Sequence, residues 1–131
     1  MATTGKNYCT TSIGDIQQLG RVTLHDELKL TGSEISINEF PADRSVPFVH
    51  THTQNEEIYI ILKGKGQFYI DGEEFSVIEG DVIRVDPAGA RCIKADRESP
   101  VRYICIQTKV GSLAQFTQND GMPAEGKPSW F

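Results

Sequence analysis

Cysteine is scarce in this chain of 131 residues, which has only Cys9, Cys92 and Cys105. The count is odd and the spacings are wide, so a framework of disulfides is not expected. Free thiols are typical of a reducing compartment. The sequence therefore predicts a cytoplasmic protein.

Positive charge is also in short supply, because 13 Lys and Arg face 18 Asp and Glu, for a net charge of −5. Nucleic-acid-binding proteins usually carry a basic face, so nucleic acid is not an expected partner. The N-terminus has no apolar stretch of the signal-peptide type, and no apolar run approaches the length that spans a bilayer. No membrane association is therefore predicted.

An amphipathic helical period is the third thing missing, since none persists for more than about two turns. Short strand-like segments separated by turn residues predict an all-β fold. Asp71-Gly72 between two such segments is a strong signal for a tight hairpin. The expected strands are Arg21–Thr23, Glu34–Phe40, Val46–His52, Glu57–Lys63, Gly66–Ile70, Glu73–Ile78, Asp81–Val85, Arg91–Ala95 and Arg102–Gln107.

The length fits one domain, residues 1–131, large enough to bury a core without disulfides. From Gly111 the composition shifts to Gly, Pro, Gln, Asn and Ser, which predicts an extended C-terminal tail over residues 111–131. Two interpretations of its end remain open. Trp130 and Phe131 either dock on a surface or partner subunit, or belong to a disordered end.

What the chain does have is His50-Thr51-His52 followed by Glu57. Alternate residues of a strand point to the same face, so the two histidines should project side by side. After a reversal, Glu57 would open the returning strand and face the pair. Two imidazoles and a carboxylate suit a divalent ion such as Zn, Fe, Mn, Ni or Cu. The alternative is that the two histidines bind no metal and are simply half-buried or exposed.

The surrounding residues extend this pattern. Gly64 completes the spacing H-x-H-x4-E-x6-G, and Gly80-Asp81, Pro87 and Gly89 follow in a second motif. Together they resemble the two signature motifs of the cupin superfamily, of the small conserved-barrel type, over roughly residues 30–110. The resemblance implies a double-stranded β-helix, or jelly-roll barrel. It also implies a metal bound by His50, His52 and Glu57.

The sequence departs from the family at Cys92, where the second motif usually ends in a fourth ligand histidine. The resemblance implies that this side chain points into the barrel beside His50, His52 and Glu57. Three interpretations stay open. A Cys92 thiolate completes a zinc site, or a protonated Cys92 leaves three protein ligands and an open metal face, or the site is degenerate and binds no metal. The second is the preferred hypothesis.

Further pocket residues can be suggested from the expected strands. Asn38 and Gln107 should line the barrel and hydrogen-bond a polar ligand, together with Cys92. Tyr59 is a candidate catalytic acid or base, although a core tyrosine with a satisfied hydroxyl is the alternative. No residue is assigned to an organic cofactor. The basic residues of the second half are expected mostly on the surface, with at most one or two facing inward: Arg84, Arg91, Lys94 and Arg102.

Residues 58–62, Ile-Tyr-Ile-Ile-Leu, are apolar on both faces of a strand, so both faces should be covered. Glu57, Tyr59 and Ile61 would line the barrel. The opposite face would pack under the other sheet, a flanking segment or a second subunit. Because cupins commonly dimerise, the resemblance favours a homodimer, and the N-terminal segment is the alternative cover.

The sequence thus predicts a small cupin whose metal site binds a small polar molecule such as a sugar derivative or keto acid. Whether it also transforms that molecule is open, because the fold hosts isomerases, dioxygenases, decarboxylases, lyases and non-catalytic binders. The alternative is a non-enzymatic module that binds a small molecule or stabilises an assembly, with a degenerate metal site. The substrate, the reaction and the ion are not encoded in any recognisable motif.

Overall fold

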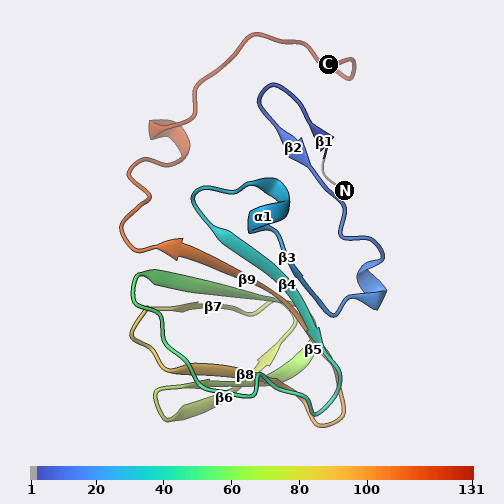
Figure 1. Ribbon diagram of the computed structural model, residues 1–131, viewed down its shortest axis with the longest axis vertical. Coiled ribbons are helices and arrows are strands. Elements are labelled where there is room, and N and C mark those ends of the chain that lie inside the picture. The colour runs from blue at the N-terminus through green and yellow to red at the C-terminus, as the bar shows by residue number, and fades with distance from the viewer. Residues whose placement is uncertain (1–2) are drawn as a thin grey trace.

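The computed structural model describes residues 3–131 as an all-β protein with very little helix (Figure 1). A small hairpin, β1 and β2, comes first, and the remaining strands, β3 to β9, form the barrel. The strands are β1 (Thr3–Thr4), β2 (Cys9–Thr10), β3 (Arg21–Thr23), β4 (Glu34–Phe40), β5 (Asn55–Ile70), β6 (Glu73–Ile78), β7 (Val82–Val85), β8 (Arg91–Ala95) and β9 (Val101–Lys109). The helical pieces are α1 (His25–Leu28) and 3₁₀ turns at Ile16–Gln18 and Thr117–Asn119.

Strand β5 is 16 residues long and belongs to both sheets of the barrel. Its first half pairs with β9 and β7, in a sheet ordered β3-β4-β9-β5-β7. Its second half pairs with β6 and β8. Between the halves the register shifts at Ile61 to Lys63, and Gly64 follows with φ 78°. A Cβ at Gly64 would collide with the Pro100 carbonyl oxygen, so only glycine fits where the strand changes sheets.

The core lies between the two sheets and is built from alternate residues of the strands, as the period of two requires. In β5 the buried positions include Glu57, Tyr59, Ile61 and Phe68. This confirms that Glu57, Tyr59 and Ile61 line the barrel. Phe68 packs against Tyr59 with ring centroids 5.0 Å apart. Other buried core residues are Val77, Val85, Ile93, Ala95, Val101, Tyr103 and Cys105.

The strands at Arg21–Thr23, Glu34–Phe40, Glu73–Ile78 and Arg91–Ala95 have the predicted bounds. Asp71 and Gly72 have φ 49° and 89°, which confirms the tight hairpin between β5 and β6. The two strands expected within residues 57–70 are one continuous strand. The prediction of a strand at Val46–His52 is wrong, because this segment makes only an isolated bridge at His50, and a second isolated bridge precedes it at Ser45.

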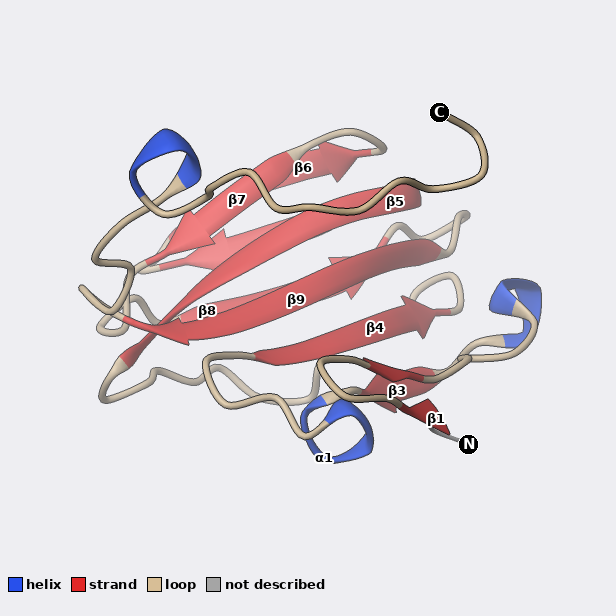
Figure 2. Cartoon of the chain, turned by 90° about the horizontal axis from the view of Figure 1, so that it is seen from above, coloured by secondary structure: helices blue, strands red, loops and turns tan. Residues whose placement is uncertain are grey.

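The terminal segments extend away from the barrel on one side (Figure 1). Seen from that side, the C-terminal segment crosses in front of β5 (Figure 2). Apart from the half-buried Pro128, residues 111–131 are exposed. Helices in the described part of the chain are about one turn long, and none has the length and apolar character needed to cross a membrane.

Candidate metal centre

The two histidines lie on an extended segment that precedes β5. His50 exchanges both backbone hydrogen bonds with Arg91, at 3.2 and 3.0 Å, and the His52 amide donates to the Pro87 carbonyl at 2.9 Å. Pro47 has no amide hydrogen, and the backbone opposite His52 is a turn rather than a strand. The segment therefore stays extended without forming a ladder, and the histidines keep the alternation that the sequence suggested.

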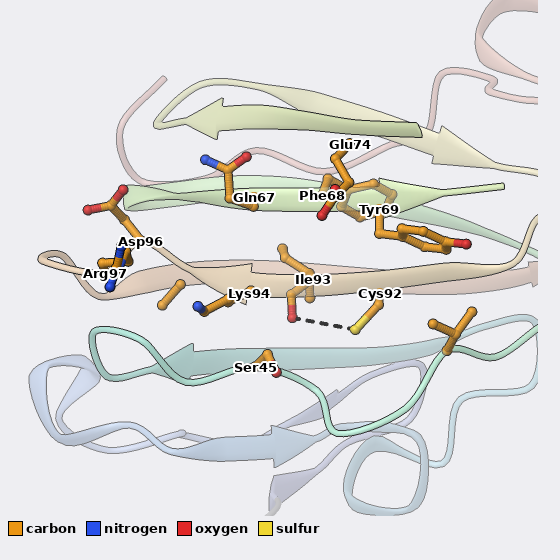
Figure 3. A pocket seen from close by; sticks show the side chains of 12 residues that line it. Ser45, Gln67, Phe68, Tyr69, Glu74, Cys92, Ile93, Lys94, Asp96 and Arg97 are labelled. Atoms are coloured by element: carbon orange, nitrogen blue, oxygen red, sulfur yellow. Dashed lines mark hydrogen bonds between the residues drawn. The ribbon is translucent and has the colours of Figure 1, made fainter. Parts of the chain in front are cut away.

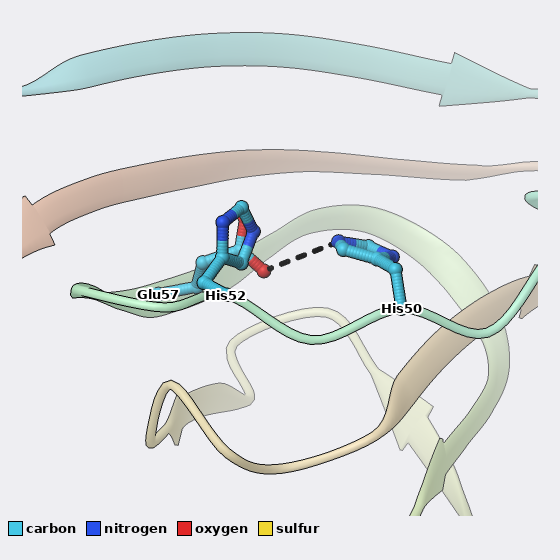
Figure 4. Close-up of side chains that lie close together, drawn as sticks. All are labelled: His50, His52 and Glu57. Atoms are coloured by element: carbon cyan, nitrogen blue, oxygen red, sulfur yellow. Dashed lines mark ion pairs between the residues drawn. The ribbon is translucent and has the colours of Figure 1, made fainter.

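His50, His52 and Glu57 converge from this segment and the start of β5 (Figure 4). One ligand atom from each lies within 4.8 Å of the others. His52 Nε2 is 3.1 Å from Glu57 Oε2, and His50 Nε2 is 4.0 Å from Glu57 Oε1. The imidazole rings are 5.2 Å apart and nearly perpendicular. The structure thus brings together the three predicted ligands.

Two ring nitrogens of this cluster, His50 Nδ1 and His52 Nε2, are buried without a hydrogen-bond partner. Buried polar atoms normally have a partner, and those left over in a native structure call for an explanation. A histidine nitrogen and a neighbouring carboxylate oxygen can bind a cation together, because both atoms can act as metal ligands. The donor set fits a divalent ion with three protein ligands.

Glu57 is only 3 % exposed, and its carboxylate is held by three donors. Arg91 Nη1 donates to Oε1 at 2.6 Å, and the Tyr59 hydroxyl donates to the same oxygen at 2.7 Å. The Cys105 thiol donates to Oε2 at 3.3 Å. Oε1 is therefore occupied by Arg91 and Tyr59, and Oε2 faces His52.

Arg91 departs from the prediction made for it. Its side chain was expected on the surface but is 0 % exposed. Besides Glu57, it donates to the carbonyls of Gly89, Asp86 and Pro87. A second buried arginine, Arg102, pairs with Glu39 at 2.8 Å. Each guanidinium is neutralised by a carboxylate, which is the condition for burying one.

Cys92 does not point into the barrel beside the histidines. Residues of β8 alternate, and Arg91, Ile93 and Ala95 take the inner face, so Cys92 faces the other way. Its thiol contacts the Val46 carbonyl at 3.3 Å. Cys92 lines a separate cleft of about 470 Å³ with Tyr69 and Lys94 (Figure 3). Burial raises its pKa.

The cavity above Glu57 has a volume of about 230 Å³. Of the predicted pocket residues, Asn38, Tyr59 and Gln107 line it and Cys92 does not. Asn38 donates to Ser36 at 2.9 Å, and Gln107 accepts from Asn55 at 3.3 Å. The further lining residues are Arg21, Ser36, Val46, Phe48, His50, His52, Glu57, Tyr103 and Cys105. Sequence reasoning missed Cys105 as a pocket residue, although its place in an alternating strand beside Gln107 was a usable signal.

The protonation states suit metal ligation. Burial lowers the pKa of His50, opposed by the charge of Glu57. Burial would raise the pKa of Glu57, but the hydrogen bonds from Tyr59, Arg91 and Cys105 outweigh it, so that pKa is lowered. At neutral pH the site therefore presents a neutral imidazole and an ionised carboxylate. Burial raises the pKa of Tyr59 far above its usual value, so the hydroxyl stays protonated.

These shifts predict that the metal-free protein loses stability in acid. The unfolded chain protonates His50 near pH 6.5, above the folded value, so stability declines as pH falls below 6.5. The Glu57 contribution is present above pH 4.5 and disappears as pH falls through its lowered folded pKa. Urea midpoints of chelator-treated protein from about pH 7.5 to about pH 4 should show both declines. The His50→Asn variant should lack the decline in stability that occurs at the higher pH. If the variant had the same pH profile as the wild type, the assignment of this decline to His50 would be wrong.

A family model described as a cupin domain matches residues 37–107, and the chain therefore belongs to the cupin family. It is similar to a cupin protein from Bacteroides fragilis of known crystal structure, with 50% identity, coverage of 92% of this chain and 100% of the other, and a TM-score of 0.87.

An uncharacterised protein of Methanocaldococcus jannaschii is 36% identical over 61 residues, which is 47% of this chain and 49% of that protein. The match thus spans about half the length of this curated relative. A putative sugar phosphate isomerase from Acidithiobacillus ferrooxidans shares the fold, with 24% identity, coverage of 66% and 57%, and a TM-score of 0.58.

Proposed function

We propose that this cupin binds one divalent metal ion on His50, His52 and Glu57 and uses it to hold a small anionic molecule in the barrel. The observation that carries the proposal is that one possible ligand atom from each of the three residues lies within 4.8 Å of the others. In addition, one ring nitrogen of each histidine is buried and has no hydrogen-bond partner. When bound, the ion would act as a Lewis acid toward a carbonyl or hydroxyl of the ligand.

Charge balance indicates the class of ligand. Arg91 already neutralises Glu57 through a contact of 2.6 Å, and a His50 with a lowered pKa adds no charge. A divalent ion would therefore bring positive charge into a buried site with no protein anion left to balance it. Burying uncompensated charge is costly. A ligand with a carboxylate or phosphate group would supply the missing negative charge, and Arg21 lines the same cavity.

A keto acid and a sugar phosphate both meet this requirement. They combine an anionic group with a carbonyl or hydroxyl that a metal ion can hold. Asn38 and Gln107 would hydrogen-bond the polar part of the ligand. The Tyr59 hydroxyl donates to Glu57 and is deeply buried, so it would orient the carboxylate rather than exchange a proton with a ligand.

A non-enzymatic binder is the second candidate, and Arg91 is the observation that favours it. Because the buried Arg91 guanidinium already pairs with the Glu57 carboxylate, the charge in the cavity is balanced without a metal ion. In that case the histidines would contact a ligand directly. The three cysteines are all unpaired, and a cytoplasmic location is part of both proposals.

Elemental analysis of protein purified without added metal or chelator tests the proposal. We expect about one divalent ion per chain, lost on dialysis against a chelator and regained on adding Zn²⁺ or Mn²⁺. With Co²⁺ as the probe, pyruvate or inorganic phosphate should change the visible spectrum of the bound ion. A chain that stays metal-free after both purification and titration would overturn the proposal in favour of the non-enzymatic binder.

A further inference from the structure

The cleft that contains Cys92 lies on the outer face of the second sheet, which β5 forms with β6 and β8. We call it the outer cleft. Its volume of about 470 Å³ is about twice that of the cavity above Glu57, which measures about 230 Å³. Small-molecule sites in proteins usually measure about 300 to 1,000 Å³. The outer cleft is therefore large enough to hold a ligand of its own, separate from any ligand in the barrel.

Two neighbouring strands supply the central side chains of the outer cleft. In β5, Gln67 and Tyr69 flank a buried core residue, and in β8, Cys92 and Lys94 do the same. Because alternate residues of a strand share a face, these four side chains point away from the barrel. The register places Tyr69 opposite Cys92 and Gln67 opposite Lys94. The four side chains thus form two adjacent rows across the strands.

The outer cleft is apolar at one end and polar at the other. The Tyr69 ring and the Cys92 thiol lie at one end, and Asp96 and Arg97 lie at the other (Figure 3). The thiol adds no charge at neutral pH, because burial raises its pKa and it donates to the Val46 carbonyl at 3.3 Å. A ligand that fits this cleft must present an apolar surface at one end and hydrogen-bonding groups at the other.

The charges that line the outer cleft balance one another. Lys94 and Arg97 are cationic, and Glu74 and Asp96 are anionic. Lys94 also pairs with Asp43 at 2.8 Å, which removes further positive charge. An anionic ligand would therefore gain no excess counter-charge, and a cationic ligand would lie close to Lys94 and Arg97. Because an ion without a partner is costly to bury, these charges favour an uncharged ligand.

A sugar is an uncharged molecule that meets these conditions. One face of a sugar ring consists of C–H groups, which can stack on the aromatic ring of Tyr69. Its hydroxyl groups both donate and accept hydrogen bonds. Gln67 donates one N–H to Ser76 at 3.0 Å, and an amide has a second N–H and an oxygen to offer. Glu74 adds an acceptor, and the exposed Ser45 hydroxyl both donates and accepts.

We propose that the outer cleft binds a neutral saccharide of two or three units, with one sugar ring stacked on Tyr69. The length of the cleft sets the number of units. It follows the chain from Cys92 to Asp96, which is roughly 13 Å of extended backbone and longer than one sugar ring. The hydroxyl groups of the remaining units then bind at the polar end. This site needs no metal ion, so it does not rest on the function proposed for the barrel.

Protection of Cys92 from alkylation tests the proposal, because a ligand in the outer cleft would cover the thiol. The probes are maltotriose, cellotriose, xylotriose and triacetylchitotriose, and peptide mass spectrometry follows the reaction with iodoacetamide. With a dissociation constant on the order of 1 mM, about 10 mM of a trisaccharide should slow alkylation about tenfold. At least one of the four should do so. Cys9, which lies in β2 outside the cleft, is the internal reference and should react at an unchanged rate.

Substitution of Tyr69 locates the sugar. Tyr69→Ala should weaken binding about tenfold, because the stacking surface is lost. Tyr8→Ala is the matched control, since Tyr8 is 61 % exposed and does not line the cleft, and it should bind as tightly as the wild type. Gln67→Ala alters an exposed side chain and replaces Tyr69→Ala if that variant does not fold. It should weaken binding about fivefold, because hydrogen bonds to the ligand are lost.

The remaining outcomes decide against the proposal. If none of the four trisaccharides slows alkylation of Cys92, the outer cleft is not a saccharide site. If octanoate or 4-hydroxybenzoate protects the thiol and no trisaccharide does, the cleft takes an anion instead. Protection that is undiminished in folded Tyr69→Ala or Gln67→Ala protein would place the sugar elsewhere. The variant in which His50 and His52 are both alanine should keep full protection, and a loss there would move the sugar to the barrel.

Discussion

Replacing Arg91 with methionine is expected to lower the free energy of unfolding by about 3 to 5 kcal/mol. The guanidinium is fully buried and donates to Glu57 and to three carbonyls of the turn that precedes β8. Methionine fills much of the same volume but satisfies none of these acceptors. The cost therefore comes from leaving the Glu57 carboxylate buried beside unpaired carbonyls.

Urea denaturation at pH 7 measures this loss, and Arg84→Met is the control. Arg84 is exposed and lies 3.5 Å from Asp86, also exposed, so its loss should change stability by less than about 1 kcal/mol. Adding Glu57→Leu to Arg91→Met should recover part of the loss, because the unpaired charge is removed. An Arg91→Met protein as stable as Arg84→Met would show that the ion pair contributes little.

Replacing both His50 and His52 with alanine is expected to weaken the binding of a divalent ion on the order of 1,000-fold or more. Two of the three proposed ligands are lost, and metal affinity depends on the number of ligands held in place. Both histidines are partly exposed, and neither ring forms part of the hydrophobic core. The variant should therefore fold, and the loss should be confined to the metal site.

Titration with Zn²⁺ against a competing chelator gives the affinity, and two variants serve as controls. His25→Ala removes an exposed histidine that pairs with Asp26, and Cys92→Ser removes a thiol that lies in a different cavity. Both should bind the ion as tightly as the wild type. Equal affinity in the histidine double variant would exclude these ligands, and a loss in Cys92→Ser would return sulfur to the ligand set.

Much of the fold could be predicted because local patterns decide it. The Asp71-Gly72 turn needs positive φ at both residues. The alternation in β4 and β8 follows from the pleat. The join between the expected strands at Glu57–Lys63 and Gly66–Ile70 could not be predicted. Gly64 looks like a strand end, but here it is the bend that carries one strand from the first sheet to the second.

The candidate site shows the same division. His50, His52 and Glu57 were predictable because their spacing matches a family motif and the chain reversal is local. It could not be predicted that Arg91, rather than Cys92, points into the barrel. A register shift of one residue decides which side of β8 faces inward. That register is set by the pairing of β8 with β5 and by the bridge from His50 to Arg91. These contacts join distant parts of the chain and leave no mark on the local sequence.

The position of β5 has a consequence for how the protein acquires its site during folding. Glu57 meets Arg91 across 34 residues of sequence and Cys105 across 48. Contacts over such separations form after the chain has lost much of its freedom, so proteins dominated by them fold in milliseconds to seconds. On the ribosome, β5 emerges long before β9, the strand that supplies Cys105. A growing chain therefore exposes its two histidines and Glu57 until β8 and β9 have left the exit tunnel, and the proposed metal site is assembled only after both strands have emerged.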